Sequence, residues 1–487
     1  AQAQSGQKEG SDVQIAQLRS ELQRARADLA NAQRRMDELA ARLDRLQNAS
    51  SGNAGNSKFQ STAPATEYES PADVTPNSQQ EEAIGNSSTG DLTEAEKLLA
   101  ARIEEQHQTK VESGSKYRVK LSGLMLMNAF STRGTVDVAD LPNLALNGKY
   151  DNGNFGATLR QTIFGLQLFG PEIAGARSSA NVAVDFFGGF PEQPFGAASG
   201  VVRLRTASAR LDWKTTSFTF GQEAPFFSPL SPTSFATVAE PAFSWAGNLW
   251  VWTPQAALEH RFVASDNTYV SVTGGVLAPV VELRSEDLLE SGQHSRRPAF
   301  ASQVSLHSKL FGQDAIVGAG AYGSRLVYDF GRHTNSWAFT SFWQVPFSHR
   351  VELSGEAYRG KAVGGLGGGI AQSVVYNGDP ATQFTQARFL NSLGGWTQLK
   401  FRVHPAWELN GAIGQDNVLA RDLEWSPVVQ SDYGVPISRN RAAFGNVIFR
   451  PRSNLLFSLE YRKLWTFQPH GVSNTADQVN VAAGVSF

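Results

Sequence analysis

The feature that most constrains this chain is a two-residue alternation of apolar and polar side chains from Tyr117 to the last residue. It is clearest in 117–129, 455–462 and 478–487, where residues of one parity are mainly apolar and those of the other are mainly polar. A period of two places successive side chains on opposite faces of a β-strand. Residues 116–487 are therefore predicted to form a large antiparallel sheet with one apolar face.

The connections between these strands are of two kinds that alternate along the chain. Alternation and turn signals together give about 16 strands. Short connections are predicted around Pro171, Thr215, Ser265, Gly312, Ser348, Pro405 and Arg452. Long ones are predicted at 131–153, 188–199, 223–248, 281–297, 328–335, 362–387, 417–438 and 467–475. This sorting predicts an all-β transmembrane barrel of about 16 antiparallel strands over 116–487, because a soluble sandwich or propeller does not sort its loops by side.

Composition agrees with a barrel and excludes a helical membrane protein. The mean hydropathy of the chain is −0.28, and no run of about 18 apolar residues could span a bilayer as a helix. Barrel strands alternate lipid-facing and lumen-facing side chains, so their mean hydropathy stays low. The chain has no cysteine, which fits an oxidising periplasm but carries little weight.

Aromatic residues are expected to form two girdles, one at each membrane interface, where amphipathic rings prefer to lie. One girdle would lie beside the short turns, and the other would lie near the long loops. The short-turn set is Trp213, Phe262, Trp343, Phe347, Trp407 and Phe449, and the long-loop set is Trp250, Trp337, Trp396 and Trp465.

The N-terminal region has a different period. Apolar residues recur at alternating spacings of three and four from Ile15 to Leu46, which predicts an α-helical coiled coil over 1–48. A single amphipathic helix packed on a globular domain is the alternative, but the rest of that surface offers nothing apolar. Leu and Met dominate over β-branched residues, which favours a trimer. The seam is Ile15, Leu18, Leu22, Ala25, Leu29, Ala32, Met36, Leu39, Leu43 and Leu46.

A linker is predicted between the coiled coil and the barrel, over 49–115. Its first part is rich in Ser, Asn, Gly, Pro and Thr and cannot bury a core. A short helix is expected over 92–106, where Thr93 and Glu96 form a capping box. This helix is a spacer or a plug of the barrel, and we favour the spacer.

Charge is distributed unevenly between these parts. The whole chain has a net charge of −2, made up of −6 in residues 1–115 and +4 in residues 116–487. Neither part is basic enough, or carries the polybasic run needed, to bind nucleic acid.

Two stretches of sequence resemble known outer-membrane barrels. The last strand, VNVAAGVSF, ends in Phe487 and is similar to the C-terminal signal that the barrel-assembly machinery reads. The segment RLRTASARLDW followed by FTFGQEAPF resembles trimeric porins. In general porins the loop between strands five and six folds into the barrel and narrows it, and the matching segment here is about 223–248.

With its N-terminal coiled coil, the chain most resembles the DcaP-like porins, whose trimers take up small, often dicarboxylic, acids. The resemblance implies a homotrimer in the bacterial outer membrane, surrounded by outer-membrane lipid and lipopolysaccharide, with the N-terminal region in the periplasm. It implies passive diffusion of small hydrophilic solutes and no cofactor or metal. The resemblance implies no particular solute for this chain.

The polar parity of the strands supplies the candidate pore residues. Acids of the same parity, from Asp185 to Glu460, could pair with these cations, so one interpretation is an ordinary paired wall. The other is a basic wall that faces acids of the constriction loop and favours anions. The predicted basic wall is Arg118, Lys120, Arg210, Lys400, Arg402 and Arg462, and the loop acids are Glu223 and Glu240.

Arg203 and Arg205 have the parity of the lipid-facing side of their strand, where a charge is costly. They lie above the hydrocarbon, lie in a subunit interface, or mark a shift of strand register.

Two other functions are less well supported by the sequence. An enzyme is disfavoured because the eight histidines are scattered and none lies in a GxSxG or HExxH context. A structural tether to the cell wall is compatible with a coiled coil roughly 50 Å long, with peptidoglycan as the candidate partner. However, the sequence shows no separate wall-binding domain.

Overall fold

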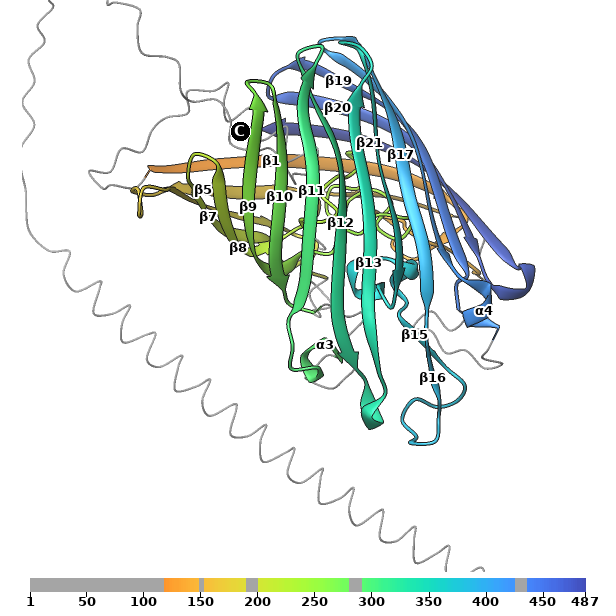
Figure 1. Ribbon diagram of the computed structural model, residues 1–487. Helices are drawn as coiled ribbons and strands as arrows, with labels where there is room; N and C mark the ends of the chain where they lie inside the picture. Colours follow the sequence, from red (N-terminus) through yellow and green to blue (C-terminus); the bar gives the residue numbers. More distant parts are fainter. Residues whose placement is uncertain (1–117, 149–152, 190–199, 280–290, 425–435) are drawn as a thin grey trace, which may run out of the picture. The chain divides into compact units, whose positions relative to one another are not determined.

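The computed structural model describes residues 118–148, 153–189, 200–279, 291–424 and 436–487. Within these residues, one antiparallel sheet curls round and closes on itself as a barrel (Figure 1). The predicted coiled coil over 1–48 and the predicted helix over 92–106 lie outside the described residues.

The first half of the barrel wall is made of β1 (Arg118–Arg133), β4 (Asn154–Thr158), β5 (Ile163–Phe169), β6 (Arg177–Asp185), β7 (Arg203–Asp212), β8 (Thr216–Glu223), β9 (Thr253–Ser265), β10 (Thr268–Leu277) and β11 (Ala299–Leu310). The second half is made of β12 (Gln313–Val327), β13 (His333–Pro346), β14 (Val351–Lys361), β17 (Asn391–His404), β18 (Trp407–Val418), β19 (Arg439–Arg452), β20 (Leu455–Phe467) and β21 (Ser473–Ser486).

Sixteen wall strands result, because β4 and β5 act as one interrupted strand. Both pair with β1, and the break between them spans residues 159–162. The other edge of β1 pairs with β21 along ten residue pairs and closes the barrel. The predicted closed barrel of 16 antiparallel strands is confirmed.

The connections sort by barrel end as predicted. Each predicted short turn is present, and the tightest are 266–267, 311–312, 405–406 and 453–454. Each predicted long connection is present at the opposite end, and the longest are 224–252 and 362–390. We call these the short-turn end and the long-loop end.

The remaining elements are short and lie in the long connections. They are β2 (Thr135–Val136), β3 (Ala145–Leu146), β15 (Val374–Tyr376), β16 (Ala387–Phe389), α3 (Ser291–His294), α4 (Ala420–Leu423) and the 3₁₀ turns η1 (Asp329–Gly331), η2 (Gly364–Leu366), η3 (Gly369–Ala371) and η4 (Pro469–Gly471). No helix among the described residues is long and apolar enough to cross a membrane.

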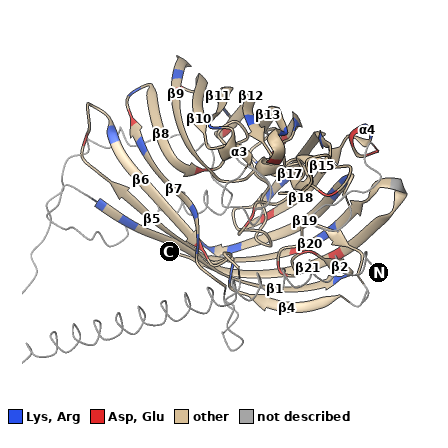
Figure 2. Ribbon diagram, turned by 90° about the horizontal axis from the view of Figure 1, so that it is seen from below, with Lys and Arg blue, Asp and Glu red and all other residues tan. Residues whose placement is uncertain are grey.

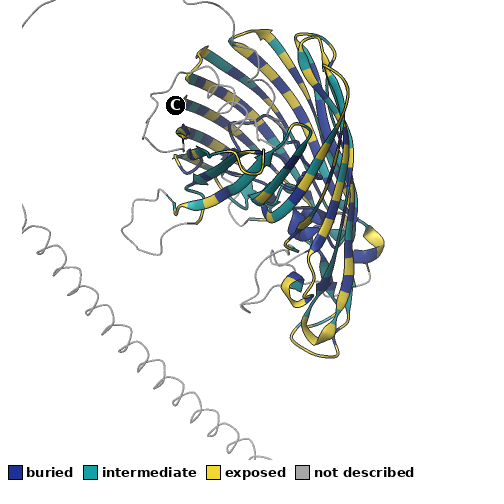
Figure 3. Ribbon diagram, turned by 60° about the vertical axis from the view of Figure 1, so that its left-hand side comes forward, coloured by how far each residue is buried: buried dark blue, intermediate teal, exposed yellow. Residues whose placement is uncertain are grey.

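Burial alternates along the strands as the sequence pattern requires (Figure 3). Met125, Met127 and Leu459 are more than half exposed on the outer face, whereas Asn128 and Glu460 are buried on the inner face. An apolar exterior and a polar interior invert the arrangement of a soluble barrel, and they are the arrangement that a lipid environment requires.

The aromatic girdle is confirmed beside the short turns and only partly confirmed near the long loops. Trp407 and Phe449 stack on the outer face with their ring centres 4.3 Å apart. The assignment of Trp396 and Trp250 to a girdle was wrong. Trp396 has the inward parity of β17 and is 3 % exposed, and Trp250 belongs to loop 224–252, where its Nε1 donates to Ser244 O.

Candidate functional site

The interior of the barrel is occupied by the connection between β8 and β9, residues 224–252, which we call the inward loop. Its sequence contains four prolines, which interrupt strand pairing, and no Lys or Arg. Most of its residues are buried, including Phe227, Phe235 and Leu249. A loop with almost no charged residues can be buried in a barrel at a low cost in free energy, provided that the wall supplies hydrogen-bond partners for its backbone groups.

Wall residues on β14 and β17 hold the first part of the inward loop. The Glu356 carboxylate accepts hydrogen bonds from Ser228 Oγ at 2.7 Å and from Leu230 N at 2.6 Å. Gln398 Oε1 accepts from Thr233 N at 2.7 Å. These strands lie far round the barrel from β8, so the loop crosses the lumen before it meets them.

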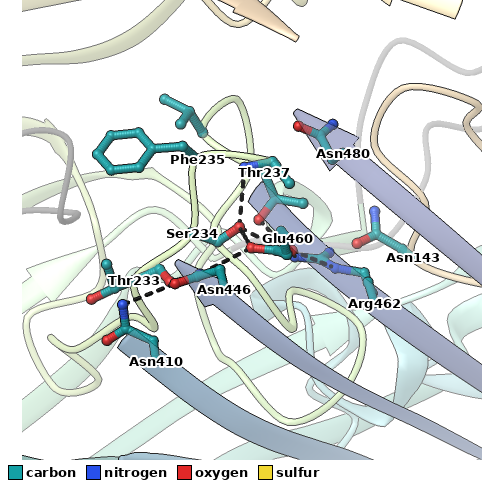
Figure 4. A network of polar contacts seen from close by, with 12 residues as sticks. Asn143, Thr233, Ser234, Phe235, Thr237, Asn410, Asn446, Glu460, Arg462 and Asn480 are labelled. Carbon is teal, nitrogen blue, oxygen red and sulfur yellow. Dashed lines mark hydrogen bonds and ion pairs between the residues drawn. The ribbon is translucent and has the colours of Figure 1, made fainter. Parts of the chain in front are cut away.

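A polar network on β19 and β20 holds the middle of the loop (Figure 4). Ser234 Oγ donates to Glu460 Oε2 at 2.6 Å, and Asn446 Nδ2 donates to Thr233 O at 2.9 Å. Arg462 pairs with Glu460 at 2.8 Å and donates to Thr237 Oγ1 at 3.2 Å. Arg462 is 2 % exposed and Glu460 is 1 % exposed, so this ion pair is an anchor for the loop.

The loop then continues along β1 and the break between β4 and β5. Asn128 Nδ2 donates to Phe235 O at 2.8 Å. The Gln161 amide both donates to Ala236 O at 2.9 Å and accepts from Val238 N at 2.6 Å. The inward loop therefore follows a large part of the inner circumference rather than hanging free.

Arg203 and Arg205 on β7 close this path. A register shift between β6 and β7 lets both side chains point inward, while Leu204 between them is 47 % exposed on the outer face. Arg203 Nη2 and Arg205 Nη1 donate to the carbonyls of Ala239 and Val238 at 2.6 and 2.8 Å, and both arginines pair with Asp185. Of the three predicted alternatives, the shift of register is the one that the structure shows.

Two more segments from the long-loop end pack inside the barrel. The segment 134–148 meets the inward loop where Asn143 Nδ2 donates to Glu240 Oε2 at 3.1 Å. In the connection 362–390, Gly369 N donates to Tyr358 Oη at 2.7 Å, and that hydroxyl donates to Asp416 Oδ1 at 2.7 Å. These segments build the apolar clusters of the interior together with the wall.

Glu240 and Asp137 lie at the joint between two of these segments. Burial raises the pKa of Glu240 to about 7, an effect that Arg203 opposes and the nearby Asp137 reinforces. Burial likewise raises the pKa of Asp137 to about 6, although its carboxylate accepts hydrogen bonds from the backbone of Asn143 and Leu144. Both carboxyls therefore titrate close to neutral pH.

Charged side chains line the wall toward the short-turn end (Figure 2 marks the charged positions). Arg210 pairs with Asp212 at 2.9 Å and with Glu259 at 3.2 Å. Lys400 lies 3.9 Å from both Glu352 and Glu408. These cations belong to networks that alternate in sign around the wall.

The structure places the predicted pore residues on the inner parity of their strands. Four of the six wall cations, Arg210, Lys400, Arg402 and Arg462, form ion pairs with wall acids. Arg118 lies at the start of β1 with its guanidinium 4.7 Å from the Phe169 ring centre, and Lys120 shares its face. Of the two loop acids, Glu223 is the last residue of β8 and accepts from Ser208 Oγ.

Sequence reasoning missed the neutral amides that hold the loop. They carry no charge, so a search for charged walls passes over them. Inward strand parity could have singled out Asn128, Gln398 and Asn446, whereas Asn143 and Gln161 lie outside the strands and carry no such signal. The amides are Asn128, Asn143, Gln161, Gln398 and Asn446.

A closed barrel of sixteen strands with an apolar exterior, sorted loops and an inward loop after the fifth strand has the architecture of a porin. Among solved structures, it resembles the outer membrane channel DcaP of Acinetobacter baumannii, with a TM-score of 0.59 and 14 % sequence identity over 77 % of this chain and 99 % of that chain. The predicted resemblance to a DcaP-like barrel is thus confirmed for the fold.

Two other porins match less well. The anion-selective porin from Comamonas acidovorans has a TM-score of 0.47 and 11 % identity over 76 % of this chain and 100 % of that chain. Salmonella typhi OmpF, in a complex with daunomycin, has a TM-score of 0.47 and 11 % identity over 78 % of this chain and 100 % of that chain. No protein-family model and no curated protein matches the sequence.

Proposed function

We propose that this chain is a porin of the bacterial outer membrane, through which small hydrophilic solutes diffuse passively. The inward loop carries the proposal, because it narrows a barrel that is too wide for wall side chains alone to fill. Polar groups of the wall hold this loop along β14, β17, β19, β20 and β1. A conducting protein in a planar lipid bilayer is the expected result, and a silent one would contradict the proposal.

We propose further that the pore favours anions. The wall cations are paired, and two of them are clearly more exposed than the acids that they pair with. The Arg402 side chain is 34 % exposed against 5 % for Glu352, and Arg203 is 24 % exposed against 0 % for Asp185. A solute that passes these two pairs therefore meets the cations first.

Reversal potentials across a bilayer with a salt gradient test the selectivity. The unmodified protein should prefer anions, and Arg210→Gln with Arg402→Gln should shift the potential toward zero. Lys463→Gln, which removes a cation from the outer face, should leave it unchanged. A preference for cations, or the same potential in the double variant, would contradict the anion proposal while leaving the pore itself intact.

A trimer held in part by the coiled coil expected over 1–48 is also part of the proposal, since the heptad seam favours three strands. Conductance should then appear in groups of three equal steps. Tethering to the cell wall is the second candidate function. The full chain should bind purified peptidoglycan, and a chain lacking residues 1–110 should not, if the tether exists.

A further inference from the structure

A glycine-rich segment folds into the long-loop end of the lumen. It comprises residues 362–373, which we call the lid segment, and it includes the turns η2 and η3. Five of its residues are glycine. Residues 362–370 are all buried, and η3 packs against the inner wall of β17 and β18. The lid segment therefore fills part of the opening at this end of the barrel.

The lid segment also lies against the last residues of the inward loop. Leu366 O accepts a hydrogen bond from Trp250 N at 3.1 Å. A Cβ on Gly367 would lie 2.8 Å from the Trp250 ring, so the missing side chain lets the two segments approach closely. The inward loop and the lid segment beside it thus narrow the lumen together.

One polar cluster holds the middle of the lid segment to the wall, and we call it the latch. Tyr358 Oη accepts from Gly369 N at 2.7 Å and donates to Asp416 Oδ1 at 2.7 Å. Asp416 Oδ2 accepts from Ile370 N at 3.3 Å. Asp416 is 0 % exposed, and a buried carboxylate is costly unless it is hydrogen-bonded. The latch therefore favours the closed position of the lid segment.

The two ends of the lid segment are anchored independently of the latch. Ser336 Oγ donates to Ala362 O at 2.8 Å, and Gln372 Nε2 donates to Ile437 O at 3.0 Å. Glycines between these anchors can absorb large changes of φ and ψ. A segment with fixed ends and a glycine-rich middle has the make-up of a hinged lid.

The closed position strains the backbone next to the latch. Ile370 and Ala371 have φ angles of +55° and +53°. This left-handed region is uncommon for residues other than glycine, and a β-branched residue such as isoleucine is an outlier there. Such conformations are destabilising and persist only where surrounding contacts hold them. Because this strain opposes the latch, the closed position is less stable than its contacts alone would make it.

We propose that the lid segment is a gate, which swings away from the inner wall when the latch breaks and thereby widens the pore. The opposition of latch and strain carries the proposal. The inference rests on the proposed pore and adds a second conductance level to it. The main level corresponds to the closed lid segment, and a larger, briefer level corresponds to the open one.

A reversible crosslink tests this movement directly. A Cβ on Gly369 would lie 3.6 Å from Ser392 Cβ, which is within the range of a disulfide, and the chain has no cysteine of its own. Gly369→Cys with Ser392→Cys should therefore lock the lid segment to β17. In planar bilayers, the oxidised protein should show the main level only, and dithiothreitol should restore the larger level. Each single cysteine variant should behave like the reduced protein.

Two further substitutions test the latch and the strain, with opposite expected effects. Tyr358→Phe should raise the fraction of time in the larger level about tenfold, because two buried hydrogen bonds are lost. Its control, Tyr322→Phe, removes another buried hydroxyl from the inner wall and should leave that fraction unchanged. Ala371→Gly should lower the fraction severalfold, because glycine adopts the left-handed conformation without strain. Its control is Ala174→Gly, at a φ of +50° in a short turn.

Three results would overturn the proposal. Identical recordings before and after reduction, in protein whose crosslink has been verified by mass spectrometry, would show that the lid segment does not move. Effects of Tyr358→Phe and Ala371→Gly in the same direction would indicate a merely structural segment. A control as strong as its test variant would do the same. A silent unmodified protein would instead contradict the pore itself, whereas steady conduction at one level would overturn the gate alone.

Discussion

At the scale of single residues, the interior depends on buried charges that the inward loop helps to satisfy. Glu460 accepts from Ser234 and pairs with Arg462, and both charged groups are almost completely buried. Burying either charge alone is costly, and the pair is tolerable only because the loop and neighbouring amides complete its hydrogen bonds.

Replacing Glu460 by Gln should destabilise the barrel, because Arg462 would keep its charge in a buried site without a carboxylate. Breaking one side of a buried pair costs about 3–5 kcal/mol. Asp477→Asn is the control, since it removes the partner of the exposed Lys463 and should cost about 1 kcal/mol or less. Urea unfolding in lipid vesicles measures both values, and equal losses would contradict the anchoring role of Glu460.

Glu240 and Asp137, which lie where the inward loop meets the segment 134–148, should make the free energy of unfolding depend on pH. The native protein raises the pKa of Glu240 from 4.5 to about 7, so the native state binds more protons than the unfolded state between these values. The free energy of unfolding should therefore fall as the pH rises from about 4.5 to 7. Asp137, with its pKa raised to about 6, acts in the same direction.

Unfolding at pH 5 and pH 8 checks this expectation. The unmodified protein should be more stable at pH 5. Glu240→Gln should reduce the difference, because an amide does not titrate and only the contribution of Asp137 remains. Glu424→Gln, outside the joint, should keep the full pH dependence. A stability that rises between pH 5 and pH 8 in the unmodified protein would contradict the assignment.

At the scale of elements, barrel closure depends on a close approach between β1 and the last residue. Gly123 exchanges two backbone hydrogen bonds with Phe487, at 2.9 and 3.1 Å. A Cβ on Gly123 would overlap the Phe487 ring, so any other residue at this contact would have to displace that ring.

Gly123→Ala should therefore lower the fraction of chains that reach the closed barrel. Gly411→Ala is the matched control, because a Cβ at Gly411 meets nothing within 4 Å. Folded and unfolded barrels are separated by their mobility in electrophoresis without heating. Equal folded fractions for the two variants would show that the Phe487 ring moves aside at no cost.

The positions of the strands were largely predictable from the sequence. The exception is the inward face of β7, which a local shift of register changes. Strict alternation predicted the strands and which face each pore residue occupies. It failed on β7, where the register shift changes the inward parity between Arg205 and Arg210. Both parities of that strand carry arginine, so the pattern contains no signal for the shift. Only the distant partners, Asp185 and the carbonyl of Val238, determine it.

At the scale of the whole molecule, the architecture was predictable and the filling of the lumen was not. The alternation of side chains and the sorting of the loops predict the wall, because side chains in its strands change face at every residue. The inward loop has no repeat, and its path depends on contacts far apart in sequence, such as Ser228 with Glu356 and Ser234 with Glu460. The pairing of Lys400 with Glu352 and Glu408 likewise follows from strand register, which the sequence pattern leaves open.

The central claim is that the inward loop sets the width of an open pore. Single-channel conductance in planar bilayers tests it most directly, by comparing the unmodified protein with a variant in which residues 226–249 are replaced by a short Gly-Ser linker. We predict discrete openings for the unmodified protein and a several-fold larger conductance for the variant, because the wall alone encloses a wide lumen. Equal conductance, or a silent protein in both cases, would contradict the account.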